Sequence, residues 1–128
     1  MYAKSALHHY QQVNTHAQVL EANPHRLIQM LMEGGLSRLA QAKGAMSRGQ
    51  IAEKGILIGK AIDIIGGLRE CLDPEKGGQI ASNLNELYLY MTRRLIEANR
   101  HNDEAKIDEV AKLLRTIKEG WDGIAPVA

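Results

Sequence analysis

The chain has 128 residues, which is enough for one compact domain with a sizeable core and too short for two such domains. Sixteen Lys and Arg against fifteen Asp and Glu give a formal net charge of +1, without the basic stripe that nucleic acids or membrane surfaces require, so we predict neither partner. The apolar share of 45% contains no Phe and one Trp, so the core must be aliphatic.

The amino-terminal end and the cysteine content indicate the compartment. The first residues lack the apolar stretch of a signal peptide, and no segment approaches the roughly 18 apolar residues of a membrane span. Cys71 is the one cysteine, so neither an internal disulfide nor a multi-cysteine metal site is available, as fits a reducing compartment. We therefore expect a cytoplasmic protein.

Residues 1–22 carry a helical pattern that is weaker than those of the later segments. Asn14 and Thr15 interrupt its apolar face, and Asn23-Pro24 separates it from the rest of the chain. We expect a short N-terminal helix that packs across a larger bundle. Its apolar positions are Tyr2, Leu7, Tyr10, Val13, Ala17 and Leu20.

Four longer segments follow, each with a stripe of apolar side chains at helical spacing. The first begins at Asn23-Pro24, because Asn caps free amides and Pro suits the first helical position. The second runs over residues 51–72 and ends before Asp73-Pro74. The third stripe runs from Ile80 to Ala98 after a turn-like stretch at residues 73–78. The fourth stripe, from Ile107 to Trp121, follows Asn102 or Asp103 as its cap and stops at Gly120 and Gly123.

The pattern predicts an all-α fold, because no segment alternates apolar and polar residues with period two. Long helices joined by short connections indicate an antiparallel up-down four-helix bundle, with the short N-terminal helix packing across it. We expect three parts: an N-terminal cap segment at residues 1–22, the bundle at residues 23–122 and a C-terminal tail at residues 123–128.

Residue patterns that carry enzyme chemistry are missing. A di-metal site in a bundle needs Glu-x-x-His motifs, which do not occur, and the i, i+4 pairs Glu21/His25 and Glu97/His101 are more typical of surface contacts. The stretch Gly55-Ile56-Leu57-Ile58-Gly59-Lys60-Ala61 lacks the Ser or Thr of a phosphate-binding loop and lies in a predicted helix. We therefore predict no enzyme, no catalytic residue, no metal and no cofactor.

Six glycines lie inside the first two predicted helices, where each costs roughly 1 kcal/mol against Ala. Two interpretations stay open: close packing between helices, or helix faces flattened into a groove for another chain. The second helix is apolar over more than half of its circumference, which favours a groove for a partner's amphipathic helix. These glycines are Gly34, Gly35, Gly55, Gly59, Gly66 and Gly67.

An ordered set of motifs covers about residues 1–122. The most specific part is the stretch Leu72-Asp73-x-Glu75-Lys76-Gly77-Gly78, followed by Leu87-Tyr88-x-Tyr90-Met91-x-Arg93-Arg94-Leu95. Asn23-Pro24-His25-Arg26-Leu27-Ile28 precedes them and Trp121 closes the set. Together these motifs resemble the flagellar secretion chaperone FliS family.

The resemblance implies a helical bundle that binds the disordered C-terminal region of flagellin as a 1:1 complex in the cytoplasm. Such a chaperone prevents premature polymerisation and delivers flagellin to the flagellar type III export gate. The N-terminal segment of the family can lie over part of the binding groove until flagellin displaces it. Leu7 and Tyr10 match that cap and handover region here.

We expect five apolar residues to line or border the flagellin groove, although a helix's widest face is normally core. An alternative from another class is a self-associating structural or regulatory bundle without a flagellin client. The free form is expected to be a monomer or a weak or swapped dimer. The five groove residues are Leu27, Leu31, Ile58, Ile62 and Ile65.

Overall fold

The computed structural model describes residues 23–124 of the chain, and nearly all of them lie in four α-helices. The predicted N-terminal helix, with Leu7 and Tyr10, lies outside the described residues, and so does most of the predicted tail. In the described part, none of the helices is long and apolar enough to cross a bilayer. The helices are α3 (Pro24–Ser47), α4 (Ile51–Glu70), α5 (Pro74–His101) and α6 (Glu104–Asp122).

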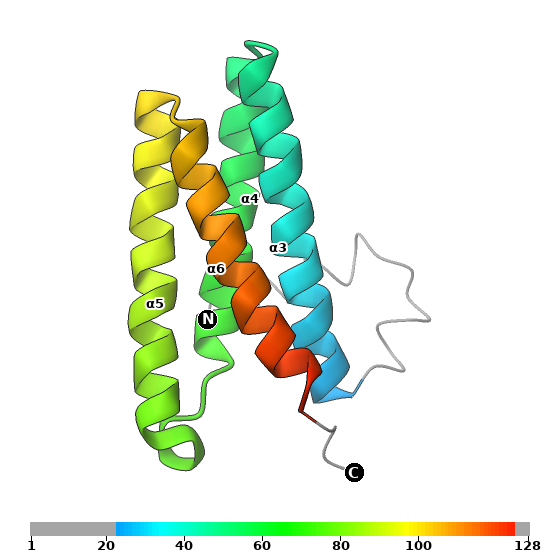
Figure 1. Cartoon of the computed structure of the whole chain (residues 1–128), viewed down its shortest axis with the longest axis vertical. Coiled ribbons are helices and arrows are strands. Elements are labelled where there is room, and N and C mark those ends of the chain that lie inside the picture. Colours follow the sequence, from blue (N-terminus) through cyan, green and yellow to red (C-terminus); the bar gives the residue numbers. More distant parts are fainter. Residues whose placement is uncertain (1–22, 125–128) are drawn as a thin grey trace.

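The four helices form a bundle in which each helix packs against two others (Figure 1). Helix α3 contacts α4 and α6, while α5 contacts the same two helices from the other side. The connections between successive helices are only two or three residues long, so neighbours in sequence run antiparallel. This arrangement confirms the predicted all-α up-down four-helix bundle.

The helix starts follow one local rule, in which a side-chain oxygen accepts hydrogen bonds from free backbone amides. Asn23 accepts from the amide of Arg26 at the start of α3. Asp73 accepts from the amides of Glu75 and Lys76 at the start of α5, and Asp103 caps α6 in the same way. The prediction left Asn102 and Asp103 open as the cap of α6, and the structure selects Asp103.

Helix α5 begins earlier than the apolar stripe from Ile80 indicates. Residues 73–78 were expected to form a turn, but the chain is helical from Pro74, and Asp73 caps that first turn. Asp-Pro is therefore a start signal here, as Asn-Pro is for α3. The sequence was right about a break in this region, since Gly78 has φ 51° and ψ −127° and separates the first turn from the rest of α5.

The core lies between the four helices and is aliphatic, with Met side chains and one aromatic ring, Tyr88, among the buried residues that the structure describes. Helices α3 and α6 approach closely at Gly35, where an added Cβ would lie 3.1 Å from Leu114 Cδ2. Close packing thus accounts for this glycine. The largest fully buried side chains are Leu31, Met32, Leu39, Ile58, Ile65, Leu68, Met91, Leu95, Ile107, Val110 and Leu114.

Candidate functional site

Helix α4 presents a line of three glycines and one isoleucine beside α5. Gly55, Gly59, Ile62 and Gly66 are spaced by four, three and four residues, so they share one side of the helix, and all four are half-buried. An added Cβ at Gly55 would lie 3.9 Å from the Oδ1 atom of Asn99 on α5, which shows that this side borders α5.

Helix α5 contributes a second line that runs along the first. Asn85 and Asn99 both lie against α4, since Asn85 Oδ1 accepts a 2.7 Å hydrogen bond from Nε of Arg69. Leu89, Thr92 and Ile96 fall between these asparagines at spacings of four and three residues, which places them on the same side of α5. We call the two lines together the α4–α5 face; its members are Gly55, Gly59, Ile62, Gly66, Asn85, Leu89, Thr92, Ile96 and Asn99.

The α4–α5 face mixes apolar and polar residues, and exposed apolar side chains lie on it and beside it. Ile96, a member of the face, is 46% exposed, and Ile56, which borders the face three residues before Gly59 on α4, is 55% exposed. An added Cβ at Gly59 would meet no atom within 4 Å, so packing inside the bundle does not require a glycine there. The two interpretations of the helical glycines therefore divide by position: Gly35 serves close packing, whereas Gly59 leaves space at the surface.

The predicted groove residues occupy two different environments. Ile62 belongs to the α4–α5 face, and Leu27 is half-buried near the start of α3. Leu31, Ile58 and Ile65 are fully or almost fully buried in the core, so they reach a binding partner only if the helices separate. A role for all five in one groove stays a prediction.

Two α5 residues of this face, Leu89 and Ile96, were not among the predicted groove residues. The signal that could have found them is the spacing of Asn85, Leu89, Thr92, Ile96 and Asn99, a second helical line beside the core stripe. Because this α5 line is about half polar, a search for apolar stripes does not detect it.

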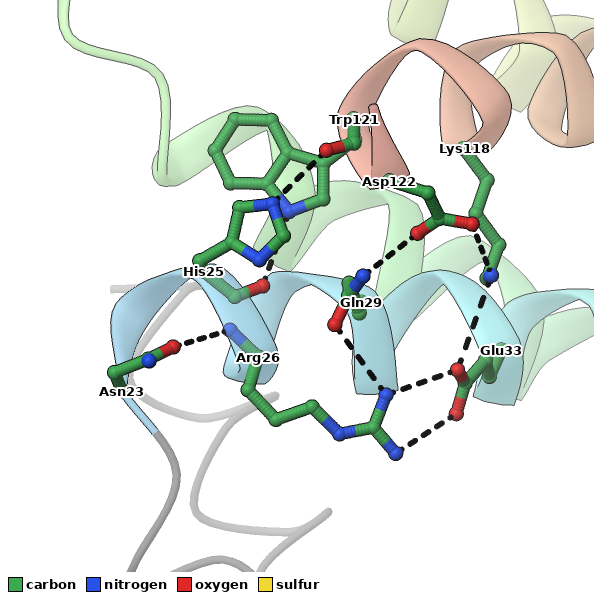
Figure 2. A network of polar contacts seen from close by, with 8 residues as sticks. All are labelled: Asn23, His25, Arg26, Gln29, Glu33, Lys118, Trp121 and Asp122. Atoms are coloured by element: carbon green, nitrogen blue, oxygen red, sulfur yellow. Dashed lines mark hydrogen bonds and ion pairs between the residues drawn. The ribbon is translucent and has the colours of Figure 1, made fainter. Parts of the chain in front are cut away.

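A polar cluster joins the start of α3 to the end of α6 (Figure 2). His25 Nε2 donates to the carbonyl oxygen of Trp121 at 2.9 Å, and Trp121 Nε1 donates to the carbonyl oxygen of His25 at 3.0 Å. The two rings stack with centroids 4.9 Å apart. Hydrogen bonds from Lys118 and Gln29 lower the pKa of the Asp122 carboxyl, which keeps this carboxylate charged. This cluster closes the bundle at the end where residues 1–22 join it.

A second polar cluster connects α5 with α6. Glu109 accepts a hydrogen bond from the hydroxyl of Tyr90 and another, 2.7 Å long, from Nε of Arg94. These two donors, Tyr90 first, lower the pKa of Glu109, and the same contact raises the pKa of Tyr90. The cation of Arg94 also lies 5.8 Å from the centre of the Tyr90 ring. These contacts join α5 to α6.

Lys54 is the one charged residue that the described part of the chain buries. Its ammonium group donates to the carbonyl oxygen of Asn99 at 3.0 Å and to Oδ1 of Asn102 at 3.1 Å. Asn102 is the left-handed residue that ends α5, with φ 54°. Lys54 therefore ties α4 to the C-terminal end of α5, where the helix dipole favours a positive charge.

Groups suited to metal binding or nucleophilic chemistry are not assembled in the part of the chain that the structure describes. No three His, Cys, Asp or Glu side chains within residues 23–124 cluster as metal ligands would. Burial raises the pKa of the Cys71 thiol, which is the reverse of what activates a nucleophile. Glu97 faces Lys106 in a 3.8 Å ion pair across the α5–α6 connection.

Comparison with known proteins places these features in a family context. Residues 6–128 match the family described as flagellar protein FliS. The chain is 66% identical over 125 residues to flagellar secretion chaperone FliSB of Pseudomonas aeruginosa, covering 98% of this chain and 99% of that protein. It is 47% identical over 129 residues to flagellar secretion chaperone FliS of Salmonella typhimurium, covering 100% and 96%. The corresponding protein of Vibrio cholerae is 45% identical over 123 residues, covering 96% and 90%.

Proposed function

The chain belongs to the flagellar protein FliS family, and we propose that it is a cytoplasmic chaperone whose client is flagellin. The names of its relatives describe secretion chaperones and not enzymes, in agreement with the prediction that no reaction is catalysed. In this proposal the disordered C-terminal region of flagellin binds as a 1:1 complex, is kept from polymerising and is delivered to the flagellar type III export gate.

The observation that carries the proposal is the exposed apolar surface of Ile96 on the α4–α5 face and of Ile56 beside it. A disordered client loses conformational entropy when it folds on a chaperone, and burial of apolar surface must offset that loss. Ile56 and Ile96 offer such surface on α4 and α5. Between them, Gly59 lets the backbone of a client helix approach α4 without meeting a side chain.

The binding test uses purified full-length chain with flagellin and with flagellin that lacks its C-terminal residues. We expect light scattering to give a 1:1 complex with the intact client and none with the truncated one. Ile56→Glu and Ile96→Glu should each raise the Kd about tenfold, because a charge replaces a buried apolar contact. Ile80→Glu is the matched control, since Ile80 is 71% exposed but lies outside the α4–α5 face.

The outcomes separate the possible partner sites. Binding that survives truncation of the client would disprove the assignment of the flagellin C-terminal region. An Ile80→Glu variant that loses as much affinity as the variants at Ile56 and Ile96 would remove the α4–α5 face from the proposal. A stable dimer of the chain alone at low micromolar concentration, abolished by Ile56→Glu, would favour the alternative of a self-associating bundle.

The N-terminal cap is a separate part of the proposal, because residues 1–22 lie outside the described structure. Leu7 and Tyr10 are proposed to cover part of the client site in the free protein and to leave it when flagellin binds. Hydrogen exchange in residues 3–20 should accelerate on addition of the flagellin C-terminal peptide. Equal protection with and without the peptide would contradict a displaceable cap.

A further inference from the structure

Two polar links join α4 to α5, one at each end of the α4–α5 face. At one end, the ammonium group of Lys54 donates to the carbonyl oxygen of Asn99 at 3.0 Å and to Oδ1 of Asn102 at 3.1 Å. At the other end, Arg69 Nε donates to Asn85 Oδ1 at 2.7 Å. Between these links, no side-chain hydrogen bond or ion pair joins α4 to α5 in the part of the chain that the structure describes.

The two links differ in burial and therefore in how firmly they hold the helices. Lys54 is 4% exposed, whereas the bond from Arg69 lies at the surface. Water competes for a surface hydrogen bond, while a buried donor has no such alternative partner. The arrangement of α4 and α5 is therefore held most firmly at the Lys54 end, where the α3–α4 and α5–α6 connections also lie (Figure 1).

The acceptors of Lys54 belong to the end of α5. Carbonyl oxygens in the last turn of a helix have no partner within that helix. The amides of Asn102 and Asp103 both donate to the carbonyl oxygen of Ala98, so the next carbonyl oxygen, that of Asn99, accepts from Lys54 instead. Asn102, the left-handed residue that ends α5, adds its side-chain oxygen. Lys54 thus caps α5 from a neighbouring helix.

This cap lies beside the exposed apolar side chains of the client site. Gly55 follows Lys54, and an added Cβ there would lie 3.9 Å from Oδ1 of Asn99, whose carbonyl oxygen is the one that binds Lys54. Ile56 is the next residue on α4, and Ile96 lies one turn before Asn99 on α5. Because hydrogen bonds are directional, two bonds from one buried nitrogen permit fewer arrangements of the helix ends than apolar contacts do.

We propose that Lys54 is a positioning residue of the client site. Its two bonds hold the end of α5 against the start of α4 and thereby fix the relative placement of Ile56 and Ile96 before a client binds. The inference rests on the proposed function, because it assigns a role within the same site. Without these bonds the last turn of α5 opens, and part of the binding free energy is used to restore the arrangement, which weakens the complex.

The test measures the Kd of the flagellin C-terminal peptide for the full-length chain and its variants, well below the temperature of unfolding. Lys54→Met should raise the Kd about tenfold, as expected for one lost hydrogen bond from a buried charged group. Val110→Ala is the destabilised control, because it removes buried methyl groups from α6, which is not part of the face, and it should change the Kd by less than about twofold. Equal losses of affinity in the two variants would overturn the proposal.

Asn102 provides a matched pair of variants that keeps the buried lysine, so the pair decides the question even if Lys54→Met does not fold. Asn102→Gly removes the acceptor oxygen but suits the left-handed backbone, so the Kd should rise about threefold. Asn102→Asp keeps an oxygen for Lys54 and should bind the peptide as the wild type does. Equal Kd values for the two variants would contradict a role for this bond.

Hydrogen exchange in the free chain gives a readout that needs no client. Lys54→Met should accelerate exchange at the amides of Asn102 and Asp103, which close the last turn of α5, more than exchange within α3. Unchanged exchange at these two amides would overturn the proposal. A wild-type chain that does not bind the peptide would contradict the proposed function and this inference with it. Equal binding by the wild type and Lys54→Met would contradict only the role of Lys54.

Discussion

His25 and Trp121 form two reciprocal hydrogen bonds, in which the ring of each residue donates to the backbone carbonyl oxygen of the other. Their rings also stack, with an angle of 15° between the two planes. The two residues are 96 positions apart, so this one contact joins the start of α3 to the end of α6. Polar bonds thereby close the bundle at this end.

Trp121→Phe keeps a ring in the stack but removes the indole N–H. We expect the free energy of unfolding to fall by about 1–2 kcal/mol, because the part-buried carbonyl oxygen of His25 loses its donor. Urea unfolding followed by circular dichroism measures this. His25→Phe removes the reciprocal bond, and the double variant should show a coupling energy of about 0.5 kcal/mol or more. Strict additivity of the two variants would mean that the bonds act independently.

Lys54→Met removes the buried ammonium group while retaining most of the side-chain length. The carbonyl oxygen of Asn99 and the amide oxygen of Asn102 then lack their donor, so we expect a loss of about 1–3 kcal/mol in unfolding free energy. Lys60→Met, on the exposed side of the same helix, should change stability by less than about 0.5 kcal/mol. Similar effects at both lysines would show that the buried bonds contribute nothing.

Gly59→Ala and Gly35→Ala make the same chemical change in two helices. At Gly59 the added methyl meets open space, so we expect the free protein to be stabilised by about 0.5–1 kcal/mol. At Gly35 the added methyl would lie 3.1 Å from Leu114 Cδ2, so crowding should reduce or reverse the gain in stability from the higher helix propensity of Ala. Thermal unfolding of both variants tests this difference. If the α4–α5 face binds the client, Gly59→Ala should also weaken the complex while it stabilises the free chain.

The lowered pKa of Glu109 predicts how the free energy of unfolding changes in acid. Tyr90 and Arg94 hold the pKa of its carboxyl below the ordinary value of 4.5, so the folded state prefers the charged form more than the unfolded chain does. Its contribution is therefore present above about pH 4.5 and is lost as the pH falls through the folded pKa. The stability difference between the wild type and Glu109→Gln should be constant from pH 7 to about pH 5 and shrink below that.

The control for this titration is Glu119→Gln. Its side chain is exposed and forms no hydrogen bond or ion pair within residues 23–124, so this substitution should change the free energy of unfolding by less than about 0.5 kcal/mol at pH 7. Urea unfolding at each pH gives both differences. A difference for Glu109 that stays constant down to pH 3 would show that its two hydrogen bonds do not favour the charged form.

The sequence is sufficient to predict the four helices, because the capping residues and the spacing of apolar residues indicate the same segments. Asn23-Pro24 and Asp103 cap helices as their residue types indicate, and the stripe from Ile107 to Leu114 is buried. The start of α5 was placed too late, because Asp73-Pro74 resembles both the end of one helix and the beginning of the next. Only the capping hydrogen bonds of Asp73 distinguish the two.

The candidate site was harder to predict, because spacing alone does not say which neighbour a stripe faces. Ile58 and Ile62 both belong to the broad apolar surface of α4, yet the first is buried and the second is half-buried beside α5. Contacts between helices decide this, as do the partners of Lys54 and Glu109, which come from other helices. No pattern within one helix contains that information.

The kink at Gly78 also constrains the length of the chain. Gly78 adopts a backbone conformation that disfavours side chains, and an added Cβ at Gly77 would lie 2.7 Å from the Cβ of Ala81. Three residues connect α4 to α5, so there is little slack to absorb a change. Deleting either glycine would rotate the following residues by about 100° around the helix axis, which turns Met91 and Leu95 out of the core. The number of residues in this stretch, as well as their identity, sets the register in which α5 meets the bundle.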